Sequence, residues 1–242
     1  EYDQAHHEYS RAILLLGTTP LQSHHAAVFF KRAFVSRKMG LIEDAIADLS
    51  QALELDPDYV DACVARGMTL YHLQRYEEAL LDFSQAARLK PDFTRAHVLA
   101  GLMQRLLGQY DQAIAVLKQA IAINPEFADA YYHRGLVYVD RGQPQDAISD
   151  FDQAINLDEA HLEAVLQRGV VYLGLQHYDQ AIADFNRAIA LNPQCSAAYT
   201  YRGQCLYEKG YQDFHRLAID DWQKAIELGA VDSNILQEKI KN

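Results

Sequence analysis

The chain has no apolar run that approaches the roughly 20 residues needed to cross a bilayer, so membrane insertion is not expected. Cysteine is scarce as well. Cys63, Cys195 and Cys205 are an odd number, and none lies in a Cys-x-x-Cys spacing. This pattern favours buried free thiols in a reducing compartment over disulfides or a metal site, and cytoplasm is the default location.

Positive charge is also in short supply. The chain carries 22 lysines and arginines against 33 aspartates and glutamates, a formal net charge of −11. Proteins that bind a phosphate backbone need clustered cations, so nucleic acid is not expected as the main partner. The acidic excess favours solubility.

Motifs for chemistry are missing too. The sequence has no nucleophile elbow, no phosphate-binding glycine loop and no paired-carboxylate signature, which argues against catalysis. The histidine doublets His6-His7 and His24-His25 do not form a chelate, because adjacent side chains on a helix point about 100° apart. We therefore expect no catalytic residue, no metal and no cofactor.

What the chain does contain is a repeat of 34 residues. Four prolines lie at multiples of this period, at Pro57, Pro91, Pro125 and Pro193. A small residue recurs at Ala33, Gly67, Gly101, Gly135, Gly169 and Gly203. Alanines recur at Ala45, Ala79, Ala113, Ala147 and Ala181, and again at Ala52, Ala86, Ala120, Ala154 and Ala188. A large apolar residue recurs at Leu49, Phe83, Leu117, Phe151 and Phe185.

The period and these columns resemble the tetratricopeptide repeat. The resemblance covers nearly the whole chain and implies an all-α fold, a right-handed α-α superhelix (solenoid) of tandem helix-turn-helix units. In that family the small residues let the two helices of a unit approach closely. The resemblance is specific for the fold and says little about function, because the columns that define the family are packing positions.

The period also predicts how the chain is divided. We expect residues 1–20 to hold the second helix of a truncated repeat and a loop, residues 21–229 six repeats, and residues 230–242 a capping helix. The six repeats are 26–59, 60–93, 94–127, 128–161, 162–195 and 196–229. Each reads as two helices, for example 58–73 and 76–89, and the capping helix as 232–241.

The two ends depart from the pattern. Tyr2-Asp3-Gln4-Ala5 matches Tyr110-Asp111-Gln112-Ala113, which suggests a fragment of a longer protein. About six extra residues around Gly17-Thr18-Thr19-Pro20 lengthen the first connection. Three more fall in a turn at 208–215, which we interpret as a tolerated surface insertion, with a specialised contact as the alternative.

One polar column pairs with another. Arginines recur at Arg32, Arg66, Arg134, Arg168 and Arg202, and aspartates at Asp48, Asp82, Asp150, Asp184 and Asp221. The third repeat has Ala100 and Val116 instead, so both members are lost together. This predicts a structural ion pair between the two helices of each unit, with a functional row of guanidinium groups as the alternative.

Function is expected on the concave surface, which the first helix of every repeat forms in this family. The slots that the resemblance implies are Phe30, Phe34, Val64, Met68, Tyr71, Arg95, Val98, Leu102, Arg105, Tyr132, Leu136, Val139, Leu166, Val170, Leu173 and Tyr207. Further slots of the same kind hold polar and charged residues: Arg37, Lys38, Asp61, His72, Asp129, Asp140, Glu163, Thr200, Gln204 and Glu208. Related repeats that grip the acidic tails of heat-shock chaperones have lysines and asparagines in slots that are apolar here, such as Phe30, Val64 and Leu102. The clamp for carboxylates is therefore absent, and the trough is apolar with mixed charge at its edges.

The sequence thus predicts a non-catalytic scaffold for protein–protein interaction, which binds a peptide or helix with apolar anchors in this groove. Internal packing of the same residues is the structural alternative. Two other functions stay open: a substrate-recruiting or regulatory arm of a larger enzyme, and a homo-oligomeric assembly module. A chain that is monomeric at every concentration in light scattering would exclude the last of these.

Overall fold

The computed structural model describes residues 2–16, 21–210 and 212–241. In these residues there are fourteen α-helices and no β-strand. The first helices of six successive pairs are α2 (Ala26–Lys38), α4 (Val60–His72), α6 (Thr94–Leu106), α8 (Ala128–Asp140), α10 (Leu162–Gly174) and α12 (Ser196–Glu208). The second helices are α3 (Ile42–Leu55), α5 (Tyr76–Leu89), α7 (Tyr110–Ile123), α9 (Pro144–Leu157), α11 (Tyr178–Leu191) and α13 (Gln212–Glu227).

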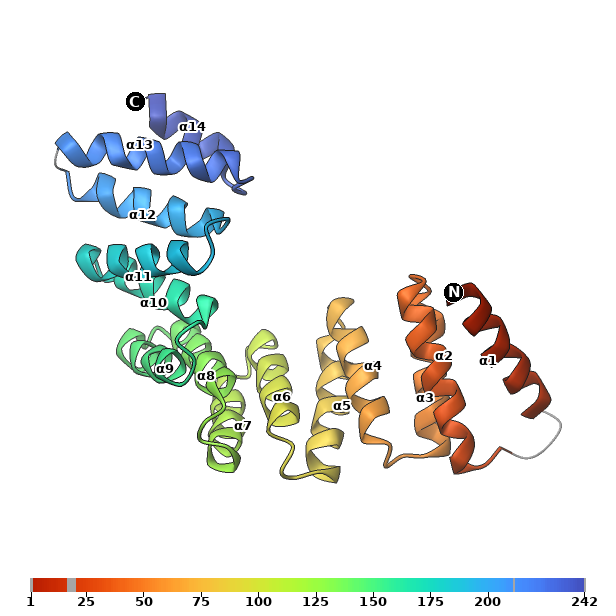
Figure 1. Ribbon diagram of the computed structural model, residues 1–242. Helices are drawn as coiled ribbons and strands as arrows, with labels where there is room; N and C mark the ends of the chain where they lie inside the picture. Colours follow the sequence, from red (N-terminus) through yellow and green to blue (C-terminus); the bar gives the residue numbers. More distant parts are fainter. Residues whose placement is uncertain (1, 17–20, 211, 242) are drawn as a thin grey trace. The chain divides into compact units, whose positions relative to one another are not determined.

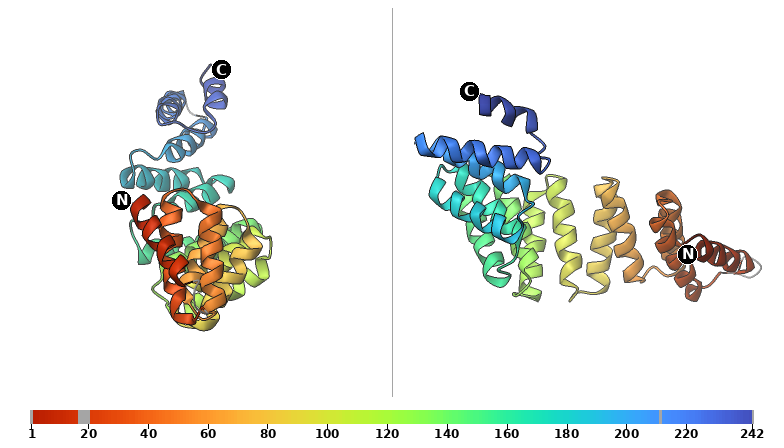
Figure 2. Two further views of the ribbon diagram at one scale, coloured as in Figure 1. Left: turned by 90° about the vertical axis from the view of Figure 1, so that its right-hand side faces the viewer. Right: turned by 45° about the horizontal axis from the view of Figure 1, so that its top comes forward.

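Two further helices flank these pairs. Helix α1 (Tyr2–Leu16) precedes a short 3₁₀ turn (Ser23–His25), and α14 (Ser233–Lys241) follows the last pair. The chain divides into two units, residues 1–125 with α1–α7 and residues 126–242 with α8–α14. Within each unit, successive helices lie side by side (Figures 1 and 2). No helix in the described ranges is both long and apolar enough to cross a bilayer.

The helices begin and end close to the positions that the period predicts. Helix α4 starts two residues later than expected, because Tyr59 (φ −75°, ψ 86°) lies outside the helical region as the N-cap. In the sixth pair, α13 begins at Gln212 and has 16 residues, against 14 in the other second helices, so part of the insertion is helical rather than a turn. The predicted insertion at 17–20 lies outside the described residues.

The repeated small and apolar columns form the core of both units. The two alanine columns and the Leu/Phe column are at most 1% exposed. A Cβ added at Gly135 would lie 2.7 Å from Cε1 of Phe151, and one at Gly169 would lie 2.7 Å from Cε1 of Phe185. Glycine is thus required here because the aromatic ring of the second helix lies against the backbone of the first.

The exception in this column supplies a test. The first repeat has Ala33 opposite Leu49, where the fifth has Gly169 opposite Phe185. We expect Gly169→Ala to destabilise the chain by about 1–2 kcal/mol, because overpacking exceeds the gain in helix propensity. Adding Phe185→Leu should make the double variant less destabilised than the sum of the single variants. Urea denaturation measures all three, and additive effects would contradict the close ring contact.

The predicted ion pairs are present in all five repeats that carry both residues. In each, the guanidinium donates Nε–H to one carboxylate oxygen and Nη2–H to the other, for example at 2.9 and 2.7 Å from Arg66 to Asp82. The five aspartates are 3–6% exposed. Burial raises the pKa of Asp82, whereas its hydrogen bonds with Arg66 lower it and raise the pKa of the guanidinium. In the third repeat, Ala100 and Val116 pack in the core instead.

The arginines also connect neighbouring repeats, which the sequence comparison did not anticipate. The free Nη1 of Arg66 donates to Ser50 Oγ at 3.0 Å, and that of Arg202 donates to Asn186 Oδ1 at 2.6 Å, both on the preceding second helix. Arg32 makes the same contact with Ser10 of α1 at 3.3 Å, so α1 occupies the place of a preceding second helix. Each such arginine therefore joins three helices.

The cysteine prediction holds for two of the three thiols. Cys63 and Cys205 are buried, and burial raises their pKa to about 11 and about 12 respectively. Such thiols are protonated and unreactive near neutral pH. Cys195 differs, since it is half-buried and lies at the N-cap of α12 rather than inside a helix.

Candidate functional site

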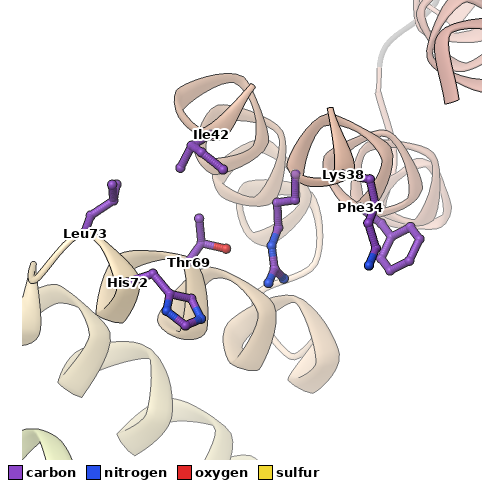
Figure 3. Close-up of a pocket in the computed structure, with 7 residues that line it drawn as sticks. Phe34, Lys38, Ile42, Thr69, His72 and Leu73 are labelled. Atoms are coloured by element: carbon purple, nitrogen blue, oxygen red, sulfur yellow. The ribbon is translucent and has the colours of Figure 1, made fainter. Parts of the chain in front are cut away.

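The first unit contains a pocket of about 490 Å³ between its first two repeats. Phe34 and Lys38 of α2 lie on one side, and Thr69 and His72 of α4 lie on the other (Figure 3). Ile42 at the start of α3 and Leu73 after α4 complete the apolar part of the wall, and Arg37 also lines the pocket. Side chains from the last turns of α2 and α4 form its wall, so the pocket exists only where two repeats meet.

The wall of this first pocket is positively charged in a chain that is otherwise acidic. None of its seven described lining residues is acidic, and Arg37 and Lys38 supply two cationic groups beside the His72 imidazole. Neither Arg37 nor Lys38 forms an ion pair with a described residue, unlike the arginines of the five helix pairs. The Lys38 ammonium lies 5.8 Å from the centroid of the Phe34 ring.

The second unit has a pocket of about 360 Å³ at the corresponding place. Five lining residues of the first pocket have counterparts three periods later in the wall of the second: Val139 for Arg37, Pro144 for Ile42, Val171 for Thr69, Gly174 for His72 and Leu175 for Leu73. None of the described residues that line the second pocket is charged. The same junction therefore presents a cationic pocket in one unit and an apolar one in the other.

One residue position distinguishes the walls of these two pockets from the same place in three other repeats. The first residue of the second helix is Tyr76, Tyr110 or Tyr178 in three repeats, but Ile42 or Pro144 at the two pockets. The Tyr76 ring packs against the cluster that contains Leu70 and Met103, and Tyr178 packs against the cluster of Phe185 and Cys205. Ile42 and Pro144 lack an aromatic side chain, so each leaves space beside the next first helix.

Most of the residues predicted for the groove are partly used in packing. Ten are half-buried and contact the core clusters: Phe30, Val64, Met68, Tyr71, Leu102, Tyr132, Leu136, Leu166, Val170 and Leu173. Arg105 is half-buried as well. Val98 is only 3% exposed because α6 packs between α5 and α7, so its side chain belongs to the core and not to an accessible surface.

The remaining predicted residues are exposed. They are Phe34, Arg95, Val139 and Tyr207. The Tyr207 ring lies tilted against those of His215 and Trp222, with centroid distances of 4.8 and 5.5 Å. Phe34 lines the first pocket, and Val139 and Val170 line the second. The further predicted slots Arg37, Lys38 and His72 also line the first pocket.

Sequence reasoning missed three residues of the first pocket and five of the second: Ile42, Thr69, Leu73, Gly142, Pro144, Val171, Gly174 and Leu175. Five of these eight lie at the turn or at the start of the second helix, and Thr69 and Val171 are only 2% and 9% exposed. A signal was nevertheless present in the sequence. The tyrosine column that begins the second helix is interrupted at residues 42 and 144.

The fold and these columns agree with comparisons to known sequences. A model described as Tetratricopeptide repeat matches residues 35–93 and 166–231, which together are more than half of the chain. The chain belongs to the tetratricopeptide repeat family. A second tetratricopeptide repeat model matches residues 128–161, and one described as TPR repeat matches residues 101–142. No curated protein sequence matches the chain.

Solved structures place the chain in the same tetratricopeptide repeat fold. The crystal structure of MamA protein is 25% identical over 70% of this chain and 92% of that one, with a TM-score of 0.61. YrrB, described as a TPR protein with an unusual peptide-binding site, is 22% identical over 80% and 98%, with a TM-score of 0.59. A tetratricopeptide repeat protein from Parabacteroides merdae ATCC 43184 is 19% identical over 99% and 91%, with a TM-score of 0.75.

Membership of the tetratricopeptide repeat family fixes the general role of the architecture. Stacked helix pairs of this kind are interaction scaffolds, because their stacking creates extended surfaces lined by successive first helices. In the described residues, no three side chains of histidine, cysteine, aspartate or glutamate converge on a point where they could hold a metal ion.

Proposed function

We propose that this tetratricopeptide repeat chain is a non-catalytic scaffold that binds a peptide or helical segment of another protein through apolar anchors. The observation that carries the proposal is the pair of pockets at equivalent repeat junctions, each lined by exposed or half-buried apolar side chains from two repeats. Pockets of this size hold one or two side chains, and each well-buried apolar side chain contributes about 1.5–3 kcal/mol to binding.

The burial of the groove residues shapes the test. Leu136 and Val170 pack against core clusters, so glutamate at either would damage the fold as well as binding. Phe34 and Val139 are better choices because they are 54% and 36% exposed and line the two pockets. Ile235 on α14 is a matched control, since it is 54% exposed and lies in neither pocket.

We expect the Phe34→Glu/Val139→Glu variant to lose the proteins that the native chain retains from a lysate of its source cell. Ile235→Glu should retain them, and circular dichroism should show all three chains folded. At position 139 a carboxylate enters an apolar pocket, where it costs several kilocalories per mole unless it is paired. At position 34 it removes the apolar ring and occupies the charge of Lys38. Together these changes predict a loss of at least about tenfold in affinity. Equal retention by the native chain and the pocket variant, or no specific retention by either, would reject binding through these pockets.

A further inference from the structure

The two pockets differ in a way that peptide binding in general does not require. They occupy the same place in the repeat, yet Arg37, Thr69 and His72 of the first correspond to Val139, Val171 and Gly174 of the second. In each of these three pairs, a polar or basic residue of the first pocket corresponds in the repeat to an apolar residue of the second. Lys38 corresponds to Asp140, which does not line the second pocket. The two pockets share a backbone arrangement, so the differences between their side chains determine which kind of ligand side chain each can bind.

We infer that the first pocket is a socket for an acidic side chain of a peptide ligand, with an apolar side chain beside it. This inference rests on the proposed peptide-binding function and specifies the ligand of one of its pockets. Arg37 and Lys38 provide cations that no described carboxylate neutralises. Phe34 and Leu73 provide the apolar contact for the neighbouring side chain, and they are 54% and 39% exposed.

The charge of the whole chain strengthens the assignment. With a net charge of −11, most of its surface repels an acidic peptide, so a local cationic pocket determines where such a peptide can bind. Basic residues in the last turn of a helix also interact with the helix dipole. The interaction with the helix dipole changes the unfolding free energy, whereas the socket changes the affinity for a peptide. These two quantities are measured separately.

This socket differs from a clamp for carboxylates built on the middle of the first helices. In the first two repeats those slots hold Phe30, Phe34, Val64 and Met68. The cations lie instead in the last turn of α2, next to the position where Ile42 replaces tyrosine. The space and the charge therefore have separate origins, and each can be removed without the other.

The chain itself supplies a variant that closes the pocket. Tyrosine occupies the equivalent position in three repeats, so Ile42→Tyr should fold and place a ring in the space beside α4. Pro144→Tyr makes the equivalent change at the second pocket. Arg37→Ala/Lys38→Ala removes the charge, and Lys31→Ala/Lys118→Ala removes the same charge from exposed positions outside the pocket in the same unit.

The experiment is a selection from a displayed library of random dodecapeptides on the native full chain, followed by fluorescence polarisation with the enriched peptides. We expect a class that combines glutamate or aspartate with an adjacent large apolar residue. Ile42→Tyr and Arg37→Ala/Lys38→Ala should each weaken binding of this class by roughly tenfold or more, and added salt should weaken native binding. Pro144→Tyr and Lys31→Ala/Lys118→Ala should change it by less than about twofold.

The outcomes separate the socket from the broader proposal. If the enriched peptides lack carboxylates, or bind Ile42→Tyr as well as the native chain, the socket is rejected while peptide binding stands. If Lys31→Ala/Lys118→Ala weakens peptide binding as much as Arg37→Ala/Lys38→Ala does, the electrostatic attraction is non-specific and the socket is also rejected. If the native chain enriches no peptide, both proposals fail. Thermal unfolding of each variant confirms that a lost affinity is not a lost fold.

Discussion

Replacing Asp150 by alanine should lower the unfolding free energy by about 3–5 kcal/mol, one of the two largest effects that we expect from a single substitution in this protein. Asp150 is 4% exposed and accepts two hydrogen bonds from Arg134, at 2.7 Å from Nε and 2.6 Å from Nη2. The Arg134 side chain is itself only 17% exposed. Without the carboxylate, a guanidinium group stays in a desolvated place between two helices with no counter-ion.

The third repeat provides the control for this prediction. Ala100 and Val116 stand where the ion pair would be, and Ala100 is 3% exposed. The double variant Arg134→Ala/Asp150→Val reproduces that arrangement and removes both charges together. We expect it to be clearly more stable than Asp150→Ala, because replacing a buried ion pair by apolar groups costs far less than breaking it.

The measurement is urea denaturation followed by circular dichroism on the full chain. The chain forms two units and need not unfold in one step, so the midpoint of the first transition is the quantity to compare. A double variant that is as unstable as Asp150→Ala would show that the aspartate stabilises the repeat by some means other than neutralising Arg134.

The second large effect is expected at Trp222. We predict that Trp222→Ala lowers the unfolding free energy by about 3–5 kcal/mol, since the indole is 1% exposed and its loss leaves a cavity. The indole packs in a cluster with Leu206 of α12, with Ala230 in the connection after α13 and with Leu236 of α14. Its Nε1–H donates to the Thr200 carbonyl at 3.3 Å. The last helix pair and the capping helix therefore share this side chain.

Phenylalanine is the matched substitution at this site. A phenylalanine lies against the column glycine in the second, fourth and fifth repeats, whereas Trp222 lies against Gly203 in the sixth. Trp222→Phe should therefore cost much less than Trp222→Ala. It removes the indole hydrogen bond, reduces the volume and weakens the cation–π contact with Lys239, whose ammonium lies 5.4 Å from the ring centroid. Thermal unfolding by circular dichroism compares the two. Equal losses would mean that the hydrogen bond, rather than the packing, holds α13 and α14 in place.

Much of the fold could be predicted from the sequence because the contacts that define it are short in range. The glycine column meets a side chain 16 residues later in four repeats, as Gly67 meets Phe83, and the arginine meets an aspartate at the same separation in four of its five pairs. A period in the sequence therefore reports directly on contacts within one helix pair. The correlated loss of both charges in the third repeat even indicated which side chains touch.

The candidate site was less predictable because the same helix face serves two purposes. Val64, Met68 and Leu102 occupy slots that face a ligand in related repeats, yet here they contact a core cluster. A sequence pattern marks such positions as apolar without saying how much of each side chain the neighbouring repeat covers. Burial depends on the size of the residues on the next first helix, and that information is spread over two repeats.

By itself, the sequence determined the helix pairs, their turns, the packing columns and the arginine–aspartate pairs, since each depends on a fixed spacing within a single repeat. Only the tertiary structure decided where a ligand has room. The pocket at Ile42 needs residues of α2, α3 and α4 together, and the third hydrogen bond of each linking arginine reaches the preceding repeat. Both depend on how one repeat stacks on the next, which is a packing outcome of many side chains and not a spacing along the chain.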